Sequence, residues 1–286
     1  MTNGDRIVQA NGVDICVETF GDPADAALVL IGGLAASMDW WQVEFCELLA
    51  AGDRFVIRYD HRDTGRSVSY PPNAPTYTGA DLFEDAVGLL DTLGVDRAHV
   101  VGLSAGGGIA QELALGHPDR VASLTLMSTS PVEPVADLPP MTDELKAVFE
   151  APSQEPDWSD REAVVDYMVD GERPFNGSLP FDEAGVRETA GRMVDRTVNI
   201  QSAVNNHWIL DHGGDAARPL AELTTPTLVF HGTADPLFPF GHALALVGLI
   251  PGARLVTLEQ VGHQYPPRAV WGDVVPAILD HTSHAD

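Results

Sequence analysis

The stretch from His99 to Gly108 constrains the fold of this chain more than any other. It reads H-V-V-G-L-S-A-G-G-G, so an apolar β-branched run enters a serine flanked by Gly102 and Gly106, and an amphipathic run follows. This order predicts a strand, a sharp turn and a helix, in which the strained turn lifts a serine hydroxyl above the carboxyl edge of a sheet. The two glycines leave room where any Cβ would clash. We predict that Ser104 is a nucleophile.

The alternative is a small-residue turn without chemistry, because so short a pattern also occurs by chance. The strand before it and the helix after it favour the nucleophile, and the turn places the Ala105 N–H at a helix N-terminus, where it can face an oxyanion. A second donor is expected from the loop after the apolar run Ala27–Ile31, which continues as Gly32-Gly33. We predict Gly33 as this donor, with Leu34 as the alternative because the register can differ by one residue.

Two further side chains follow Ser104 in an informative order. Asp235 comes just after the predicted strand Pro226–Phe230, and His263 comes just after the predicted strand Ala253–Leu258. A serine hydroxyl is a poor nucleophile at neutral pH, so it needs a neutral imidazole to take its proton, and the imidazole needs a carboxylate on its other nitrogen. The chain order serine, acid, histidine is found in such sites. The predicted catalytic residues are therefore Ser104, Asp235 and His263.

Other assignments of the acid and the histidine remain open at this point. Asp235 precedes Pro236 and also suits a turn, and Asp211 and Asp215 are alternative acids. Only His263 follows the last predicted strand directly after a glycine. The other histidines are expected in strand-end loops, before the serine strand, at a helix end or in the tail: His61, His231, His99, His117, His281 and His284. Two more, His207 and His212, could touch substrate, although packed or solvated roles are the simpler expectation.

Composition limits the partners of the chain. Its 286 residues include 42 acidic and 16 basic ones, a formal net charge of -26, so its field repels nucleic acid and anionic membranes. The first residues lack a basic region followed by an apolar core, and no apolar run approaches the length of a membrane span. We expect a cytoplasmic protein, monomeric or homodimeric, that acts on a small molecule rather than on nucleic acid or a membrane.

The sequence indicates neither a cofactor nor a metal. It contains no G-x-G-x-x-G, no Walker loop and no cluster of metal ligands at helical spacing. Its two cysteines, Cys16 and Cys46, are far from any C-x-x-C spacing, so we expect two buried thiols rather than a disulfide or a zinc site.

Strand and helix patterns alternate along most of the chain. A hairpin is predicted around Asn11-Gly12, and a helix over Asp81–Leu93 leads into the serine strand. Further buried strands are predicted over Phe55–Tyr59 and Val121–Met127, and Trp271–His281 is predicted to be a closing helix. This alternation favours an α/β fold with a mostly parallel central sheet and helices on both faces. The core domain is expected over residues 1–130 and 216–286, in one large domain with an insertion.

The insertion is expected over residues 131–215. Prolines and acidic residues open it, helical patterns cover Asp160–Val169, Asp182–Val194 and Thr197–Ile209, and no strand pattern occurs. Its large apolar side chains exceed what these helices need for packing on one another: Phe149, Trp158, Tyr167, Met168, Phe175, Phe181, Met193 and Trp208. We predict a helical cap that places an apolar pocket over Ser104, with ordinary helix packing as the alternative.

Two loop regions are interpreted as structural. The run from Asp60 to Ser67 is expected to form a tight loop held by hydrogen bonds from Asp60 and Arg62 to backbone groups. Trp40, Trp41 and Phe45 are expected on helix faces that pack against the sheet.

Taken together, these motifs resemble those of the α/β-hydrolases along the whole chain. Within that superfamily the chain is most similar to the anthracycline (aclacinomycin) methylesterases, on the segments G-D-P-A-D-A-A-L-V-L at Gly21–Leu30, Y-D-H-R-D-T-G-R-S at Tyr59–Ser67, D-R-A-H-V-V-G-L-S at Asp96–Ser104, and P-T-L-V-F with A-D-P at Pro226–Pro236. Asp63 stands where most relatives have glycine, and residues 131–215 have no comparable match. The resemblance implies Ser104, Asp235 and His263 as the triad and Gly33 and Ala105 as oxyanion donors.

The implied reaction is the hydrolysis of a fairly apolar carboxylic ester through an acyl-enzyme, with a methyl ester of a polyketide-type compound as one candidate. Lactonases, carbon–carbon bond hydrolases and cofactor-free perhydrolases share the same triad, and a ligand-binding receptor with a slow triad is a different class. Epoxide hydrolases and haloalkane dehalogenases use an aspartate nucleophile, which Ser104 argues against.

Overall fold

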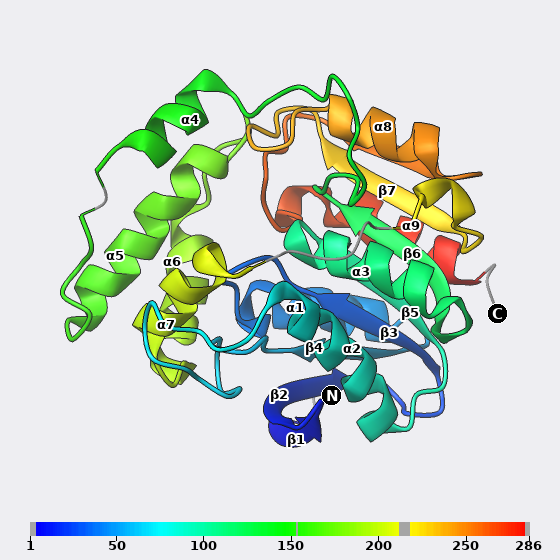
Figure 1. The fold of residues 1–286 in the computed structure, drawn as a ribbon, viewed down its shortest axis with the longest axis horizontal. Helices are drawn as coiled ribbons and strands as arrows, with labels where there is room; N and C mark the ends of the chain where they lie inside the picture. Colours follow the sequence, from blue (N-terminus) through cyan, green and yellow to red (C-terminus); the bar gives the residue numbers. More distant parts are fainter. Residues whose placement is uncertain (1–3, 153, 212–217, 284–286) are drawn as a thin grey trace.

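An eight-stranded sheet lies at the centre of the molecule in the computed structural model, which describes residues 4–152, 154–211 and 218–283 (Figure 1). The strand order is β1-β2-β4-β3-β5-β6-β7-β8. In this order, all neighbouring strands from β4 to β8 are parallel, as the alternating pattern predicts. The strands are β1 (Arg6–Ala10), β2 (Val13–Phe20), β3 (Ala26–Ile31), β4 (Arg54–Tyr59), β5 (Ala98–Leu103), β6 (Val121–Met127), β7 (Thr227–Gly232) and β8 (Arg254–Leu258).

The predicted hairpin forms the antiparallel edge of this sheet. β1 and β2 pair from Arg6 opposite Val17 to Ala10 opposite Val13. The two residues between them, Asn11 and Gly12, have φ angles of 46° and 76°. A two-residue turn with both φ angles positive matches the twist of the flanking strands, which is why Asn-Gly favours it.

Helices cover both faces of the sheet, as predicted. One face packs against α2 (Gly79–Leu93), α3 (Ala105–Gly116) and α8 (Gly241–Leu249), and the other packs against α1 (Val43–Ala50) and α9 (Trp271–Ser283). Neighbouring residues of the central strand β5 serve opposite faces, because successive side chains of a strand alternate: Val100 belongs to the first cluster and Val101 to the second. Burial on both sides explains the continuous apolar runs in these strands.

Residues 131–215, named the helical segment from here on, run between β6 and β7. The segment contains α4 (Asp143–Glu150), α5 (Arg161–Glu172), α6 (Glu183–Arg196), α7 (Ile200–Asn205) and the 3₁₀ turns η3 (Arg173–Phe175) and η4 (Asn206–Ile209), and its described part has no strand. These helices lie together beyond one end of the strands, the end where α3 begins (Figure 1). The segment is therefore placed next to the serine turn.

Two of the three predicted helices of this segment are confirmed, and the third differs. The pattern over Thr197–Ile209 predicts one helix, but the chain forms α7 and then the tighter turn η4. The change occurs at Asn206, which is fully buried. Its amide donates to Asp63 Oδ2 (2.9 Å) and accepts from the Asn73 N–H (2.7 Å), so contacts with the core override the local helical preference.

The loop after β4 is structural, but only one of its two predicted anchors binds the backbone. The Asp60 carboxylate accepts the N–H groups of Met38 (2.8 Å) and Arg66 (3.0 Å). The prediction for Arg62 is wrong, because its guanidinium group donates two 2.7 Å hydrogen bonds to the carboxylate of Asp85. Both side chains are buried, and a buried guanidinium group is best satisfied by a bidentate carboxylate.

The aromatic residues that follow β3 divide between core and site. Trp41 and Phe45 are buried against the sheet as predicted. The prediction for Trp40 is wrong: its ring stacks on Tyr265 with centroids 6.0 Å apart, and its Nε1–H donates to Met193 Sδ in α6 at 3.4 Å. Trp40 lies in the 3₁₀ turn η1 (Met38–Trp40), where successive side chains point in different directions.

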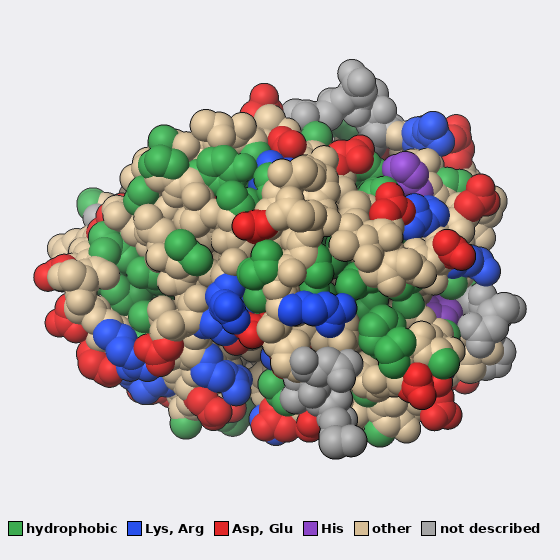
Figure 2. Space-filling view, turned by 90° about the horizontal axis from the view of Figure 1, so that it is seen from below, with side chains coloured by type: hydrophobic (Ala, Val, Ile, Leu, Met, Phe, Trp, Pro, Cys, Tyr) green, Lys and Arg blue, Asp and Glu red, His purple; other side chains and the backbone are tan. Residues whose placement is uncertain are grey.

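The face of the molecule drawn in Figure 2 carries charged side chains of both signs. Acidic and basic side chains are interspersed toward the end of the molecule that carries the helical segment (Figure 2). Both cysteines are buried free thiols, as predicted. Among the residues described, no helix is both long and apolar enough to cross a lipid bilayer.

Candidate active site

Ser104 occupies a strained turn between β5 and α3. Its φ of 55° and ψ of -120° lie in a region that side-chain-bearing residues rarely adopt, so the surrounding contacts must hold it there. The Ser104 N–H donates to Met127 O (3.0 Å), and Thr129 Oγ1 donates to Ser104 O (2.7 Å). A Cβ on Gly102 would overlap the Gly106 backbone, and a Cβ on Gly106 would overlap the Ile31 carbonyl. The glycines therefore provide the room that the pattern predicts.

The fold brings the three predicted catalytic residues into one chain of hydrogen bonds. His263 Nε2 lies 2.9 Å from Ser104 Oγ, and His263 Nδ1 lies 2.9 Å from Asp235 Oδ2. Because an ionised carboxylate only accepts, Nδ1 carries the proton and the Nε2 lone pair faces the serine hydroxyl. The backbone N–H of His263 donates to Phe175 O in the helical segment at 2.8 Å. This geometry allows His263 to take the serine proton.

The loop after β7 fixes the Asp235 carboxylate. Asp235 is 3% exposed, and its Oδ1 accepts the backbone N–H groups of Leu237 (2.9 Å) and Phe238 (2.8 Å). His231 Nε2 donates to Phe238 O (2.7 Å) and lies 3.6 Å from Asp235 Oδ2. Burial lowers the pKa of His231, which favours a neutral ring beside the carboxylate. Oδ2 is thereby left to face His263.

The other candidates for acid and histidine lie elsewhere. Asp211 is exposed, and the hydrogen bonds of the His263 ring go to Asp235 and Ser104. Asp215, His212 and His284 lie outside the described residues. His207 is fully buried, with Nδ1 on the Ala35 N–H (2.9 Å) and Nε2 on Arg62 O (2.8 Å), so both ring nitrogens bind the protein backbone.

The loop after β3 (residues 32–35, named the β3 loop) borders the serine. A Cβ built on Gly33 would lie 3.5 Å from Ser104 Cβ. The Gly33 N–H, which the sequence predicts as an oxyanion donor, donates to the hydroxyl of Tyr265 at 3.0 Å. The N–H groups of Leu34 and Ala105 have no hydrogen-bond partner within the described ranges. Tyr265 was not expected in the site; its only local signal is its place two residues after His263.

A line of aromatic rings leads from His263 to the surface of the helical segment. Ring centroids are 6.0 Å apart between His263 and Phe175, 6.0 Å between Phe175 and Phe149, and 6.1 Å between Phe149 and Trp208. Phe149 is 46% exposed and Trp208 is 54% exposed. Phe238 also packs edge-on against the His263 ring, with centroids 5.3 Å apart. Apolar surface therefore extends from His263 outward.

Glu172, the last residue of α5, has a strongly raised carboxyl pKa. It is three residues from Val169, on the face of α5 that packs against α6. Burial raises the pKa of Glu172 to about 7, and no ion pair or hydrogen bond to its side chain exists among the residues that the structure places. Its negative charge also adds to the raised pKa of Tyr265, for which burial is the main cause.

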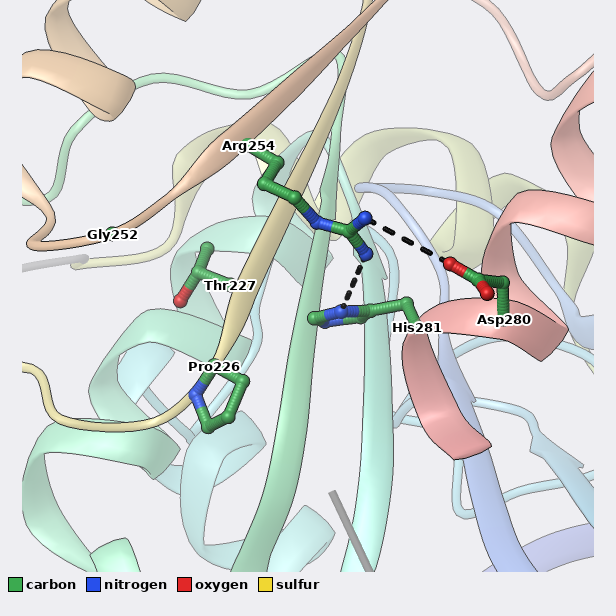
Figure 3. A pocket seen from close by; sticks show the side chains of 6 residues that line it. All are labelled: Pro226, Thr227, Gly252, Arg254, Asp280 and His281. Atoms are coloured by element: carbon green, nitrogen blue, oxygen red, sulfur yellow. Dashed lines mark hydrogen bonds and ion pairs between the residues drawn. The ribbon is translucent and has the colours of Figure 1, made fainter. Parts of the chain in front are cut away.

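A separate hollow lies at the opposite end of the sheet. It is lined by Pro226, Thr227, Gly252, Arg254, Asp280 and His281, at the amino ends of β7 and β8 (Figure 3). Arg254 contacts Asp280 (3.8 Å) and His281 Nδ1 (3.4 Å) across it. Because Ser104, Asp235 and His263 all follow the carboxyl ends of strands, this hollow is remote from them. The described part of the chain contains no group of three or more side chains suited to hold a metal ion.

Comparison with known proteins defines the class. Residues 26–264 match the model of the α/β hydrolase fold family, so the chain belongs to that family. It is 37% identical to rhodomycin D methylesterase DauP of Streptomyces sp. strain C5 and 36% identical to rhodomycin D methylesterase DnrP of Streptomyces peucetius, with 98% of each chain covered. The chain is accordingly a hydrolase of the esterase type, as its motifs predict.

Solved structures of similar proteins agree with the fold. The meta-cleavage product hydrolase CumD of Pseudomonas fluorescens IP01 superposes with a TM-score of 0.75 at 21% identity, covering 98% of both chains. The esterase RhEst1 of Rhodococcus sp. ECU1013 superposes with a TM-score of 0.74 at 22% identity, covering 99% of both chains. At these identities the likeness establishes the architecture alone.

Proposed function

We propose that this esterase acts through a serine acyl-enzyme, with Ser104 as the nucleophile, His263 as the general base and Asp235 as the residue that orients His263. The observation that carries the proposal is the chain of two 2.9 Å hydrogen bonds that joins the three side chains. His263 takes the Ser104 proton as Oγ attacks the ester carbonyl, and returns it to the leaving alcohol. Water then attacks the acyl-enzyme as His263 takes its proton, and the acid is released when the proton is returned to Ser104 Oγ.

The oxyanion of each tetrahedral intermediate is bound, in this proposal, by two backbone amides. Ala105 supplies the first, at the N-terminus of α3. For the second we choose Leu34 over Gly33, because the Gly33 N–H already donates to the Tyr265 hydroxyl and the Leu34 N–H has no partner in the described structure. Ala105 directly follows Ser104 and Leu34 lies in the β3 loop that borders it, which suits donors aimed at a carbonyl bound to its Oγ.

The proposed substrate is a fairly apolar carboxylic ester, specifically a methyl ester on a polyketide-type ring system. Two observations support this class. The relatives that match over 98% of the chain are named for the methyl ester of rhodomycin D. The rings of Phe175, Phe149 and Trp208 form apolar surface next to His263, where the acyl part of a large flat ester can pack. We propose that residues 131–215 act as the cap that selects this ester.

Burst kinetics test the proposed chemistry. Wild type, Ser104→Ala and His263→Ala are each mixed with p-nitrophenyl acetate and butyrate, and the acyl-enzyme is followed by intact mass. We expect wild type to gain one acyl group, and Ser104→Ala to lose about 10⁴-fold or more in kcat/KM. Near-native turnover by Ser104→Ala would contradict the proposal, and so would a wild type that binds the ester without being acylated.

The substrate is tested separately from the chemistry. Wild type is offered an anthracycline methyl ester and a simple acyl ester, and the released acid is measured by chromatography. Hydrolysis of the methyl ester with the higher kcat/KM is expected. Hydrolysis of the simple ester alone would refute the substrate proposal and leave the triad intact.

A further inference from the structure

The β3 loop is held by three side chains that come from distant parts of the chain. His61 Nε2 donates to Gly32 O (3.1 Å), the Gly33 N–H donates to Tyr265 Oη (3.0 Å), and the Ala35 N–H donates to His207 Nδ1 (2.9 Å). The Leu34 N–H between the last two bonds has no partner among the placed residues. The loop is thus fixed on both sides of one unpaired donor.

His207 reaches this loop from the helical segment. Its ring is fully buried, and its Nε2 donates to Arg62 O at 2.8 Å. The proton on Nε2 leaves the Nδ1 lone pair to accept the Ala35 N–H. Ala35 has a φ of 60°, a conformation that costs energy for alanine, so the loop needs such an external contact to keep it.

Tyr265 holds the other side. A Cβ added to Gly32 would lie 2.9 Å from the Tyr265 hydroxyl, so the phenol packs directly against the loop backbone. The rings of Trp40 and Trp41 pack on Tyr265, with centroids 6.0 and 4.9 Å away, and fix its orientation. The Gly33 amide is therefore directed toward the phenol and is already paired.

We propose that His207 and Tyr265 are positioning residues of the oxyanion hole: by binding the amides of Ala35 and Gly33, they orient the β3 loop so that the Leu34 N–H faces the oxyanion. The inference rests on the proposed serine mechanism. Through His207, the helical segment then affects the rate of the chemical step as well as the binding of substrate.

Two substitutions of His207 separate positioning from space filling. In His207→Asn the side-chain oxygen takes the place of Nδ1 and accepts the Ala35 N–H, while the contact with Arg62 O is lost. In His207→Gln the amide nitrogen takes the place of Nε2 and keeps the contact with Arg62 O, but nothing accepts the Ala35 N–H. We expect kcat to stay within about 3-fold in His207→Asn and to fall about 10- to 100-fold in His207→Gln, with KM little changed in both.

A matched pair of phenol substitutions tests the other side. Tyr265→Phe removes the acceptor of the Gly33 N–H and is expected to lower kcat about 10- to 100-fold with KM unchanged. Tyr59→Phe is the control, because the Tyr59 hydroxyl is buried without a hydrogen-bond partner in the described structure. An aryl boronic acid, which forms a tetrahedral adduct with the serine, should lose affinity in parallel with kcat in Tyr265→Phe and His207→Gln.

The outcomes are distinguishable. Equal losses of kcat in His207→Asn and His207→Gln, or a Tyr265→Phe variant with the kcat of Tyr59→Phe, overturn the positioning roles. Circular dichroism checks that each variant is folded, and if the His207 variants do not fold, the phenol pair decides. A wild type that is never acylated at Ser104 contradicts the serine mechanism itself, whereas an acylated wild type with unaffected variants contradicts only this inference.

Discussion

The strand-end loops of the sheet and the helical segment treat charged and apolar side chains in opposite ways. At the loop after β4 the carboxylates are buried and paired: Asp60 of the loop, and Asp85 of α2, which pairs with Arg62 of the loop, are 0% exposed and each accepts several hydrogen bonds. In the helical segment the ion pair of Arg161 with Asp195 lies at the surface, while the ring of Phe149 is about half exposed. Charged side chains are thus buried at the strand-end loops and exposed in the helical segment.

The proposed function accounts for this difference. A triad works only if its groups are held to within a fraction of an ångström, and buried charges with complete hydrogen bonding give that rigidity at a high desolvation cost. A surface that receives an apolar molecule has to leave its rings uncovered until the molecule arrives. The two regions meet where Arg196 of α6 binds Asp39 (2.9 Å) and Asp60 (2.7 Å), an ion-pair cluster at the base of the helical segment.

Breaking one ion pair in each region should give the largest contrast. Asp85→Ala leaves Arg62 buried, with Asp81 at 3.7 Å as its one remaining ion-pair partner among the described residues, and we expect the free energy of unfolding to fall by about 3–5 kcal/mol. Asp195→Ala removes the partner of the exposed Arg161 and should leave the midpoint of urea unfolding unchanged. Equal losses in the two variants would remove the proposed distinction between the regions.

Glu172 is an exception within the helical segment, since it is half-buried and has no ion-pair or hydrogen-bond partner among the described residues, and its effect should depend on pH. Its pKa is raised from the ordinary value of 4.5 to about 7 in the folded chain, so folding favours the protonated carboxyl. The contribution of Glu172 to stability is therefore complete below pH 4.5, and this contribution is lost as the pH rises through 7 and the folded carboxyl ionises. Glu172→Gln removes the ionisation. We expect the gain in unfolding free energy of Glu172→Gln over wild type to be about 2 kcal/mol larger at pH 8 than at pH 5.5.

Urea unfolding at the two pH values measures this gain. The control is Glu144→Gln, because Glu144 is an exposed glutamate of α4. A gain in Glu172→Gln that does not change with pH, or a control that shows the same change, would contradict the assignment of the raised pKa to Glu172.

The exposed rings of the helical segment should affect substrate binding more than the chemical step. Phe149→Ala removes the ring between Phe175 and Trp208, and KM for a large aromatic methyl ester should rise about 3- to 10-fold with kcat unchanged. KM for p-nitrophenyl acetate should not change. Leu244→Ala on α8, which removes another exposed apolar side chain, is the control. A lower kcat in Phe149→Ala would mean that the ring also orients the ester.

The features that the sequence predicts well are local. The serine turn, the hairpin at Asn11-Gly12 and the loops that carry Asp235 and His263 each depend on a few neighbouring residues and on the end of a strand. Their order along the chain was enough to predict three side chains that the fold brings within hydrogen-bond distance.

The features that the sequence did not predict depend on partners far away in the chain. Nothing near Gly33 indicates that Tyr265 binds its amide, because the two are 232 residues apart. The pairing of Arg62 with Asp85, the orientation of Trp40 and the break of the predicted helix at Asn206 likewise arise from tertiary contacts. Local propensity cannot encode such contacts, so the geometry of the β3 loop is visible only in the folded chain.

The bond between Gly33 and Tyr265 also bears on the order of events during synthesis. It joins residues 232 positions apart, and the bond between Ser104 and His263 joins residues 159 apart. Contacts of such high sequence separation form late, because a long loop must close before they stabilise anything. A nascent chain that has left the ribosome only as far as β7 has neither bond, however much of its sheet has formed. Hydrolytic activity should therefore appear only after the last loop and α9 have emerged, and its return after denaturation should follow the recovery of helix and strand signals.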